Sequence, residues 1–220
     1  MEEHTLEGTP FEFEEIDCAR WPRREHFEFF ASYSEPFFSI TSDVDCSGLV
    51  KRCRQQDRSP TFALWHGVLT AAQRVPEFRT RILEDRVVSF KRVHQSPTVL
   101  RSDRTFGVGF LPYIEDGERF QELARGVVDE VKRSTGFQLR EGRRVDLVHF
   151  STVPWFRFTG LNHARARIAG ESEPKITLGK FSEVEPGKFQ IPVSVMAHHG
   201  LVDGFQVAEY LQTLGSLWNE

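Results

Sequence analysis

The sequence has few of the residues that build disulfide scaffolds, zinc motifs or membrane spans. Its three cysteines, Cys18, Cys46 and Cys53, are an odd number without Cys-x-x-Cys spacing, which indicates reduced thiols in a cytoplasmic protein. No apolar run reaches the roughly 18 residues of a membrane span, and the start Met-Glu-Glu-His lacks the pattern of a signal peptide. Linkers and internal repeats are also missing. We therefore expect one domain over residues 1–220, with residues 1–10 as an N-terminal arm and no membrane partner.

The charge balance gives no sign of a polyanionic partner. There are 28 Lys and Arg residues against 32 Asp and Glu, for a net charge of -4. Binding to nucleic acid is therefore not expected. The 20 phenylalanines against two methionines predict a rigid aromatic core and favour an aromatic-lined pocket for a small molecule.

Strand and helix patterns are mixed along the chain without strict βαβ alternation. Two apolar faces mark the helices best: the one after Ser59-Pro60, and the last one, whose predicted buried face carries Phe205, Ala208, Leu211 and Trp218. The pattern predicts an α+β fold, a two-layer sandwich of a mixed β-sheet and helices. Strands are predicted over 37–42, 86–90, 98–100, 106–111, 146–152, 175–181 and 189–196, and helices over 47–55, after Pro60, over 118–133 and over 204–218.

The run His198-His199-Gly-Leu-Val-Asp203-Gly follows an apolar strand near the C-terminus. An imidazole at the end of a buried strand can be held in one tautomer and aimed at a substrate hydroxyl, as general-base catalysis requires. The same residues also suit a pair of core histidines or metal ligands. Asp203 has two readings as well, since its carboxylate can cap the following helix or organise the loop that carries His199. A buried carboxylate would need a cation, and arginine is the natural partner.

Several segments together resemble the type A chloramphenicol acetyltransferases over nearly the whole chain. The first is Trp21-Pro-Arg-Arg-Glu-His-Phe-Glu-Phe29, the second is Ser151-Thr-Val-Pro-Trp155, and the third is His-His-x-x-x-Asp-Gly. The third is shared with dihydrolipoyl acyltransferases and condensation domains. The N-terminal segment and the short length favour the chloramphenicol acetyltransferases among these families. Trp155 itself is most simply a core residue. Further matches are Ser59-Pro60, Thr105-Phe106 and the segment 176–180.

The resemblance implies a role for each matching residue. His199 would be the base that takes the proton from the acceptor hydroxyl, and His198 would be structural. Ser151 would stabilise the tetrahedral oxyanion, a contribution of about 3 kcal/mol where such donors have been removed. Arg23 would pair with Asp203 behind the base and hold its geometry.

The acceptor pocket shows departures from the family. Phe30 stands where a tyrosine hydroxyl commonly contacts chloramphenicol, and His149 stands where asparagine is frequent. Phe106 and Val108 keep an apolar wall. Near the CoA end of the family's tunnel, the matching residues are Thr177 and Lys180.

The function implied by the resemblance is transfer of acetyl from acetyl-CoA to a hydroxyl of chloramphenicol by direct attack, with acetyl-CoA as co-substrate and no bound cofactor or metal. It also implies a homotrimer with active sites at subunit interfaces. One alternative is an acetyltransferase of the same mechanism for another hydroxylated small molecule. Another is a metal-binding or non-catalytic protein that uses His198, His199 and Asp203.

Overall fold

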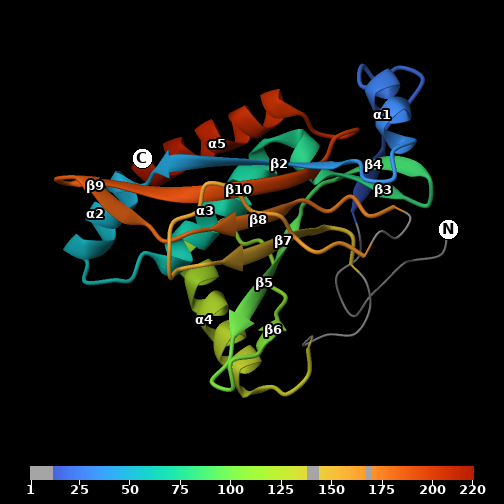
Figure 1. Ribbon diagram of the computed structural model, residues 1–220. Coiled ribbons are helices and arrows are strands. Elements are labelled where there is room, and N and C mark those ends of the chain that lie inside the picture. The colour runs from blue at the N-terminus through green and yellow to red at the C-terminus, as the bar shows by residue number, and fades with distance from the viewer. Residues whose placement is uncertain (1–11, 138–143, 167–169) are drawn as a thin grey trace.

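The computed structural model describes residues 12–137, 144–166 and 170–220. Its largest element within these residues is a mixed seven-stranded sheet (Figure 1), built from β2 (Phe37–Asp45), β5 (His94–Leu100), β6 (Phe106–Val108), β7 (Leu147–Thr152), β8 (Lys175–Leu178), β9 (Ser182–Glu185) and β10 (Lys188–His198). The strand order is β2-β10-β8-β7-β5-β6, and β9 pairs with β10. Strands β5, β7 and β8 are parallel, whereas β10 is antiparallel to β8 and β2.

A small antiparallel sheet lies beside the main one. It joins β1 (Phe13–Glu15), β4 (Arg86–Phe90) and β3 (Thr80–Leu83), and a 3-10 turn, η1 (Pro76–Arg79), precedes β3. The rings of Phe13 and Phe90 meet edge to face at 5.6 Å. Of these elements only β4 is predicted from the sequence, because the others have three or four residues and too little alternation to be recognised.

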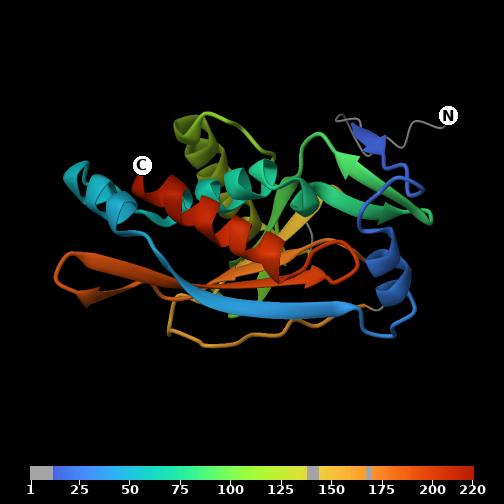
Figure 2. The same cartoon turned by 90° about the horizontal axis from the view of Figure 1, so that it is seen from above.

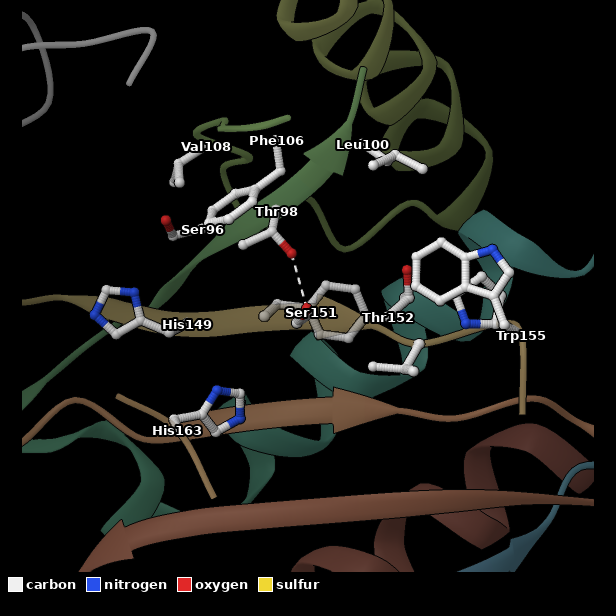
Figure 3. Close-up of a pocket in the computed structure, with 13 residues that line it drawn as sticks. Ser96, Thr98, Leu100, Phe106, Val108, His149, Ser151, Thr152, Trp155 and His163 are labelled. Carbon is white, nitrogen blue, oxygen red and sulfur yellow. Dashed lines mark hydrogen bonds between the residues drawn. The ribbon is translucent and has the colours of Figure 1, made fainter. Parts of the chain in front are cut away.

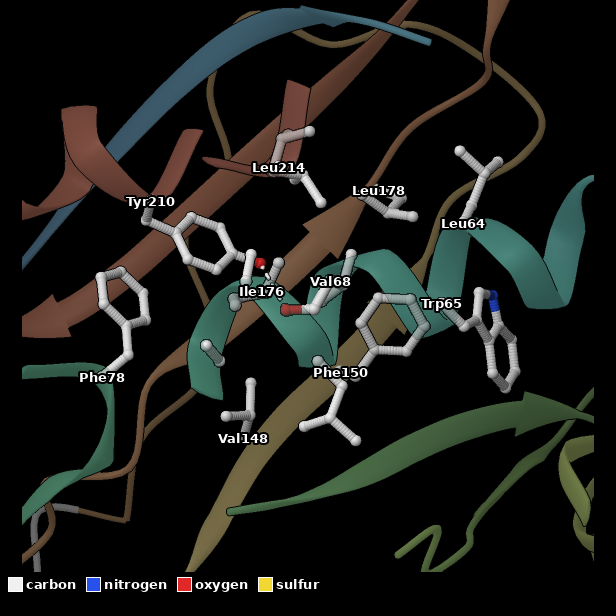
Figure 4. Packing of buried hydrophobic residues seen from close by; sticks show 14 of the residues in the cluster. Leu64, Trp65, Val68, Phe78, Val148, Phe150, Ile176, Leu178, Tyr210 and Leu214 are labelled. Atoms are coloured by element: carbon white, nitrogen blue, oxygen red, sulfur yellow. Dashed lines mark hydrogen bonds between the residues drawn. The ribbon is translucent and has the colours of Figure 1, made fainter. Parts of the chain in front are cut away.

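Helices cover one face of the main sheet (Figure 2), where α5 lies against β2 and α3 packs on α5 and, through Trp65, on β7. The helices are α1 (Arg24–Ala31), α2 (Ser47–Gln55), α3 (Thr61–Arg74), α4 (Gly117–Arg133) and α5 (Gly204–Asn219). Helix α3 is buried on almost every side. Its Trp65 meets Phe150 of β7 at 5.1 Å, and Val68 packs in the same cluster (Figure 4). Each such side chain contributes about 1.5–3 kcal/mol when it is buried.

The alternation of side chains along β7 separates the core from the opposite face of the sheet. Val148 and Phe150 are buried toward α3, so His149 and Ser151 point to the face that the helices do not cover. His163, between β7 and β8, lies on that face beside Thr177, which is paired with Ser151. The fold thus places the two predicted site residues of β7 side by side, outside the core.

The predicted α+β sandwich of mixed sheet and helices is confirmed, and the helix over 47–55 and the strand over 86–90 have the predicted bounds. The predicted strand over 106–111 is too long, since β6 ends at Val108 and Leu111 forms only an isolated bridge with Gln95. The predicted arm, residues 1–10, lies outside the described residues.

The buried face predicted for α5 is right for Trp218 and partly right for Leu211, which is half-buried against the core, but wrong for Phe205 and Ala208. Phe205 is 67% exposed and Ala208 is exposed, whereas Val207, Tyr210 and Leu214 are buried with Trp218. The buried positions 207, 210, 214 and 218 follow the 3.6-residue period and lie on one side of the helix, whereas Phe205 and Ala208 lie outside that side. Phe205 is thereby left on the surface in the first turn of α5, where its backbone N–H donates to Asp203.

Candidate active site

His199 lies in a tight turn at the end of β10. The carbonyl of His198 accepts hydrogen bonds from the backbone N–H groups of Leu201 and Val202, at 2.9 and 3.0 Å, and the backbone N–H of His199 donates to the carbonyl of Pro36 at 2.7 Å. A Cβ at Gly200 would lie 3.2 Å from the Cα of Phe27, so the turn has little room for a larger residue.

Two aromatic rings hold the imidazole of His199. The ring of Phe30 stacks on it at 4.0 Å and 8°, and Phe38 lies at 4.4 Å on a tilt of 35°. Nδ1 of His199 is buried and has no hydrogen-bond partner among the described residues. The other ring nitrogen, Nε2, is therefore the one left for a substrate.

Arg23 and Asp203 form the predicted pair behind His199. Nη1 of Arg23 donates to Oδ2 of Asp203 at 2.8 Å, and Nη2 donates to the carbonyl of His199 at 3.3 Å. The Arg23 side chain is 13% exposed and that of Asp203 is 32% exposed. Asp203 also caps α5: its Oδ1 accepts from the backbone N–H of Phe205 at 2.8 Å, and Gln206 completes a capping box. Asp203 thus caps α5 and is linked through Arg23 to the backbone of His199.

The charge on Asp203 is stabilised in this setting. Burial alone would raise its pKa, but the hydrogen bonds from Arg23 and the Phe205 backbone, with the positive charge of Arg23, outweigh it. The pKa of Asp203 is therefore below its ordinary value, and the carboxylate stays ionised near neutral pH.

The ring of His198 is packed inside the protein. Its side chain is buried, its Nδ1 accepts the backbone N–H of Gly200 at 3.1 Å, and its ring meets Phe37 edge to face at 5.4 Å. Burial, reinforced by the positive charge of Arg165, lowers the pKa of His198 to about 4. The ring is therefore neutral at physiological pH.

Ser151 lies in a cavity of about 590 Å³ on the uncovered face of the sheet (Figure 3). Its Oγ is 2.8 Å from Oγ1 of Thr98 on the neighbouring strand β5. The walls combine apolar side chains with hydroxyl and imidazole groups, and Phe106, Val108 and His149 are all among them. The lining residues are Ser96, Thr98, Leu100, Phe106, Val108, His149, Phe150, Ser151, Thr152, Val153, Pro154, Trp155 and His163.

His163 is a cavity residue that sequence reasoning missed. It lies between β7 and β8, where no periodic pattern marks it, and Oγ1 of the buried Thr177 lies 3.0 Å from its Nε2. Thr98 was also missed, although its position on a strand beside Ser151 could have pointed to it. Trp155, expected in the core, is 60% exposed at the cavity instead, since it follows Pro154 at the point where the chain leaves the sheet.

The two residues predicted to contact CoA are in different environments. Thr177 is fully buried on β8, with its hydroxyl turned to His163, whereas Lys180 is exposed just after that strand. Their contact with CoA stays a prediction.

One chain does not bring His199 and Ser151 together. Ser151 pairs with Thr177 and Thr177 with Ser194, so His199 lies five residues farther along β10 and two strands away. With about 3.3 Å per residue and 4.8 Å per strand, the two residues are roughly 15–20 Å apart. Figure 1 shows the same separation, with the end of β10 beside α1 and the end of β7 at the opposite side. A base and an oxyanion donor acting on one carbonyl need about 6 Å between their polar atoms.

The metal-site alternative receives no support from the geometry. Among the residues that the structure describes, no three His, Cys, Asp or Glu side chains gather as a metal site requires. Cys18, Cys46 and Cys53 are free thiols, and burial with the nearby Asp45 charge raises the pKa of Cys46 to about 12. Within the described part of the chain, no helix combines the length and the apolar character needed to cross a bilayer.

Two solved acetyltransferases share this fold. A solved dihydrolipoamide acetyltransferase of Azotobacter vinelandii matches 89% of this chain with a TM-score of 0.62, at 14% identity, which shows a shared fold. A solved chloramphenicol acetyltransferase matches more closely: the TM-score is 0.85 at 27% identity, over 93% of this chain and 99% of that one.

The chain belongs to the chloramphenicol acetyltransferase family, whose model matches residues 11–215. Chloramphenicol acetyltransferase 3 of Escherichia coli is 27% identical over 94% of this chain and 97% of its own length. The chloramphenicol acetyltransferase of Campylobacter coli is 29% identical over 95% of this chain and 100% of its own. The resemblance drawn from the sequence motifs is thereby confirmed.

Proposed function

We propose that this protein transfers acetyl from acetyl-CoA to a hydroxyl of chloramphenicol, as a cytoplasmic homotrimer with its active sites between subunits. The observation that carries the proposal is the His199 turn, stacked on Phe30 and tied to Arg23, in a chain of this family. The contacts of Arg23 with Asp203 and with the His199 backbone, and the contact of Ser151 with Thr98, support the proposed roles. Thr177 and Lys180 remain the proposed contacts of CoA.

The base acts through Nε2 of His199. That nitrogen takes the proton from the acceptor hydroxyl as its oxygen attacks the thioester carbonyl carbon. Arg23 holds the backbone carbonyl of His199, and Phe30 and Phe38 fix the plane of its ring. The imidazolium that forms then gives its proton to the departing CoA thiolate, so no covalent enzyme intermediate is needed.

Ser151 stabilises the charge that develops on the carbonyl oxygen. For its hydroxyl proton to point at that oxygen, Thr98 must be the donor in the 2.8 Å contact between the two hydroxyls. A hydroxyl that accepts one hydrogen bond donates a second one more strongly. Thr98 is thus a positioning residue for the oxyanion donor.

The site is completed by a second copy of the chain. His199 and Ser151 lie roughly 15–20 Å apart in one chain by the strand register, too far to act on one carbonyl. Large aromatic side chains are exposed near both: Phe29, whose ring contacts Phe30, near the base, and Phe106 and Trp155 at the cavity. Two such surfaces on one chain fit a head-to-tail ring, in which the base of each subunit faces the cavity of the next.

The first test is release of free thiol from acetyl-CoA by the purified protein, with and without chloramphenicol. Release that depends on the drug supports the proposal. The absence of release in a protein that still binds acetyl-CoA contradicts it for this acceptor. The wild-type protein without chloramphenicol measures the background hydrolysis.

A second candidate is the same chemistry on another hydroxylated small molecule. Phe30 lacks the hydroxyl that contacts chloramphenicol in the family, and two imidazoles, those of His149 and His163, line the cavity. A panel of alcohols in the same thiol assay distinguishes the two candidates, because the better acceptor gives the higher kcat/KM.

A further inference from the structure

One side of the Ser151 cavity is built from imidazoles. His149 and His163 come from β7 and from the chain between β7 and β8, and both lie to the same side of Ser151, with Trp155 on the other (Figure 3). The remaining wall is largely apolar, from Leu100, Phe106 and Val108. A ligand that fills this cavity therefore meets apolar surface around its body and polar groups on one side.

Each imidazole has a nitrogen available to a ligand. Nε2 of His163 is engaged by Thr177 at 3.0 Å, so in either tautomer Nδ1 is left. Neither ring nitrogen of His149 hydrogen-bonds to a residue in the described part of the chain. Burial lowers the pKa of His163, and Lys175 lowers it further. For His149, burial outweighs the opposing charge of Glu173 and lowers the pKa to about 4. Both rings are thus neutral near pH 7. His149 presents one donor and one acceptor, whereas His163 presents Nδ1 alone, as donor or acceptor according to its tautomer.

The strand register sets how far the two imidazoles lie from Ser151. His149 and Ser151 are two residues apart on one face of β7, about 7 Å along the strand. Thr177, which holds His163, is paired directly with Ser151 across β8, about 5 Å away. A polar group on the acceptor a few bonds from the reacting hydroxyl would reach the imidazoles while that hydroxyl reacts beside Ser151.

We propose that His149 and His163 are specificity-determining residues that hydrogen-bond a second hydroxyl of the acceptor. The acceptor class is then a small diol with an apolar body. This inference rests on the proposed acetyltransferase function. Phe30, beside the base, has no hydroxyl for the acceptor, so the polar contacts come from the two imidazoles of the Ser151 cavity.

The test compares two acceptors that differ in one hydroxyl: chloramphenicol, which has two, and its analogue that lacks the secondary hydroxyl and keeps the reacting primary one. The preference is the ratio of their kcat/KM values. His163→Leu should lower the preference by about two- to twelvefold, the effect of one net hydrogen bond. The matched variant His163→Gln keeps a polar group of similar length and should retain most of it. The pair His149→Leu and His149→Asn tests the second imidazole in the same way.

Because both acceptors are measured on the same sample, a loss of folded protein cancels in the ratio. An unchanged preference in both leucine variants would overturn the inference and leave the proposed function intact. If the wild type releases no thiol with either compound, the proposed function fails instead. Isothermal titration calorimetry then measures the affinity of each compound for the wild type and the leucine variants. The leucine variants should reduce the difference in affinity between the two compounds, and an unchanged difference would refute the inference.

Discussion

Arg23→Ala gives the sharpest test of the contacts behind the base. The substitution removes the 2.8 Å ion pair with Asp203 and the 3.3 Å hydrogen bond to the carbonyl of His199. It leaves Asp203 with the backbone N–H of Phe205, so the cap of α5 survives. The expected result is a less stable protein in which the His199 turn is also less well held.

The burial of the two side chains sets the magnitude. Breaking a fully buried pair costs about 3–5 kcal/mol, whereas exposed pairs contribute about 0.2–1 kcal/mol. Arg23 is 13% exposed and Asp203 is 32% exposed, so the stranded carboxylate regains part of its hydration. We expect a loss of about 2 kcal/mol, which for a chain of this size lowers Tm by roughly 4–8 °C.

Thermal unfolding at a fixed protein concentration measures the loss, since an oligomer's Tm depends on concentration. Arg24→Ala is the matched control, because its pair with Glu28 is exposed on both sides and should cost less than about 0.5 kcal/mol. The pKa of Asp203 is lower in the folded protein than in the unfolded chain, where it is about 3.9. The pair therefore stabilises the protein fully above about pH 3.9, and this stabilisation is lost as the pH falls through the folded pKa. Equal Tm values for the Arg23 and Arg24 variants would refute the reasoning.

Three further predictions concern catalysis and pH. Ser151→Ala should lower kcat about 100-fold or more with little change in KM, and Thr98→Val should lower it less; an unchanged kcat would remove Ser151 from the oxyanion site. Phe30→Ala should lower kcat more than Phe30→Tyr, which keeps the stacked ring; equal rates would show that stacking is unimportant. The pKa values of His149 and His198, about 4 when folded, are below the unfolded value of about 6.5. Their neutral burial thus stabilises the protein fully above pH 6.5, and this stability is lost as pH falls toward 4; equal urea midpoints at pH 7 and pH 5 would contradict it.

Sequence patterns predicted the parts of the fold that repeat with a regular period. The helix over 47–55 and the strand over 86–90 could be located because their apolar positions alternate or recur at helical spacing. Helix α1 could not, because none of its residues is buried and its Arg23 cap makes no side-chain hydrogen bond to the helix. Its existence follows from tertiary contacts, such as those of Phe30 with His199.

The residues of the candidate site also differ in whether local sequence patterns could identify them. The sequence motifs identified His199, Asp203 and Arg23, and the structure brings these three together. The motifs gave no sign of His163, which reaches the cavity through an irregular segment and a contact with Thr177. Local patterns carry no information about such long-range contacts.

If the base of one subunit serves the cavity of the next, two inactive variants should complement each other in a mixed trimer. His199→Ala and Ser151→Ala are co-expressed with different tags, and mixed trimers are isolated through both tags. In a head-to-tail ring, each mixed trimer pairs one intact His199 with one intact Ser151, so about one third of wild-type turnover should return. Turnover no higher than that of the separate variants would place both residues of each site in one chain and contradict the account.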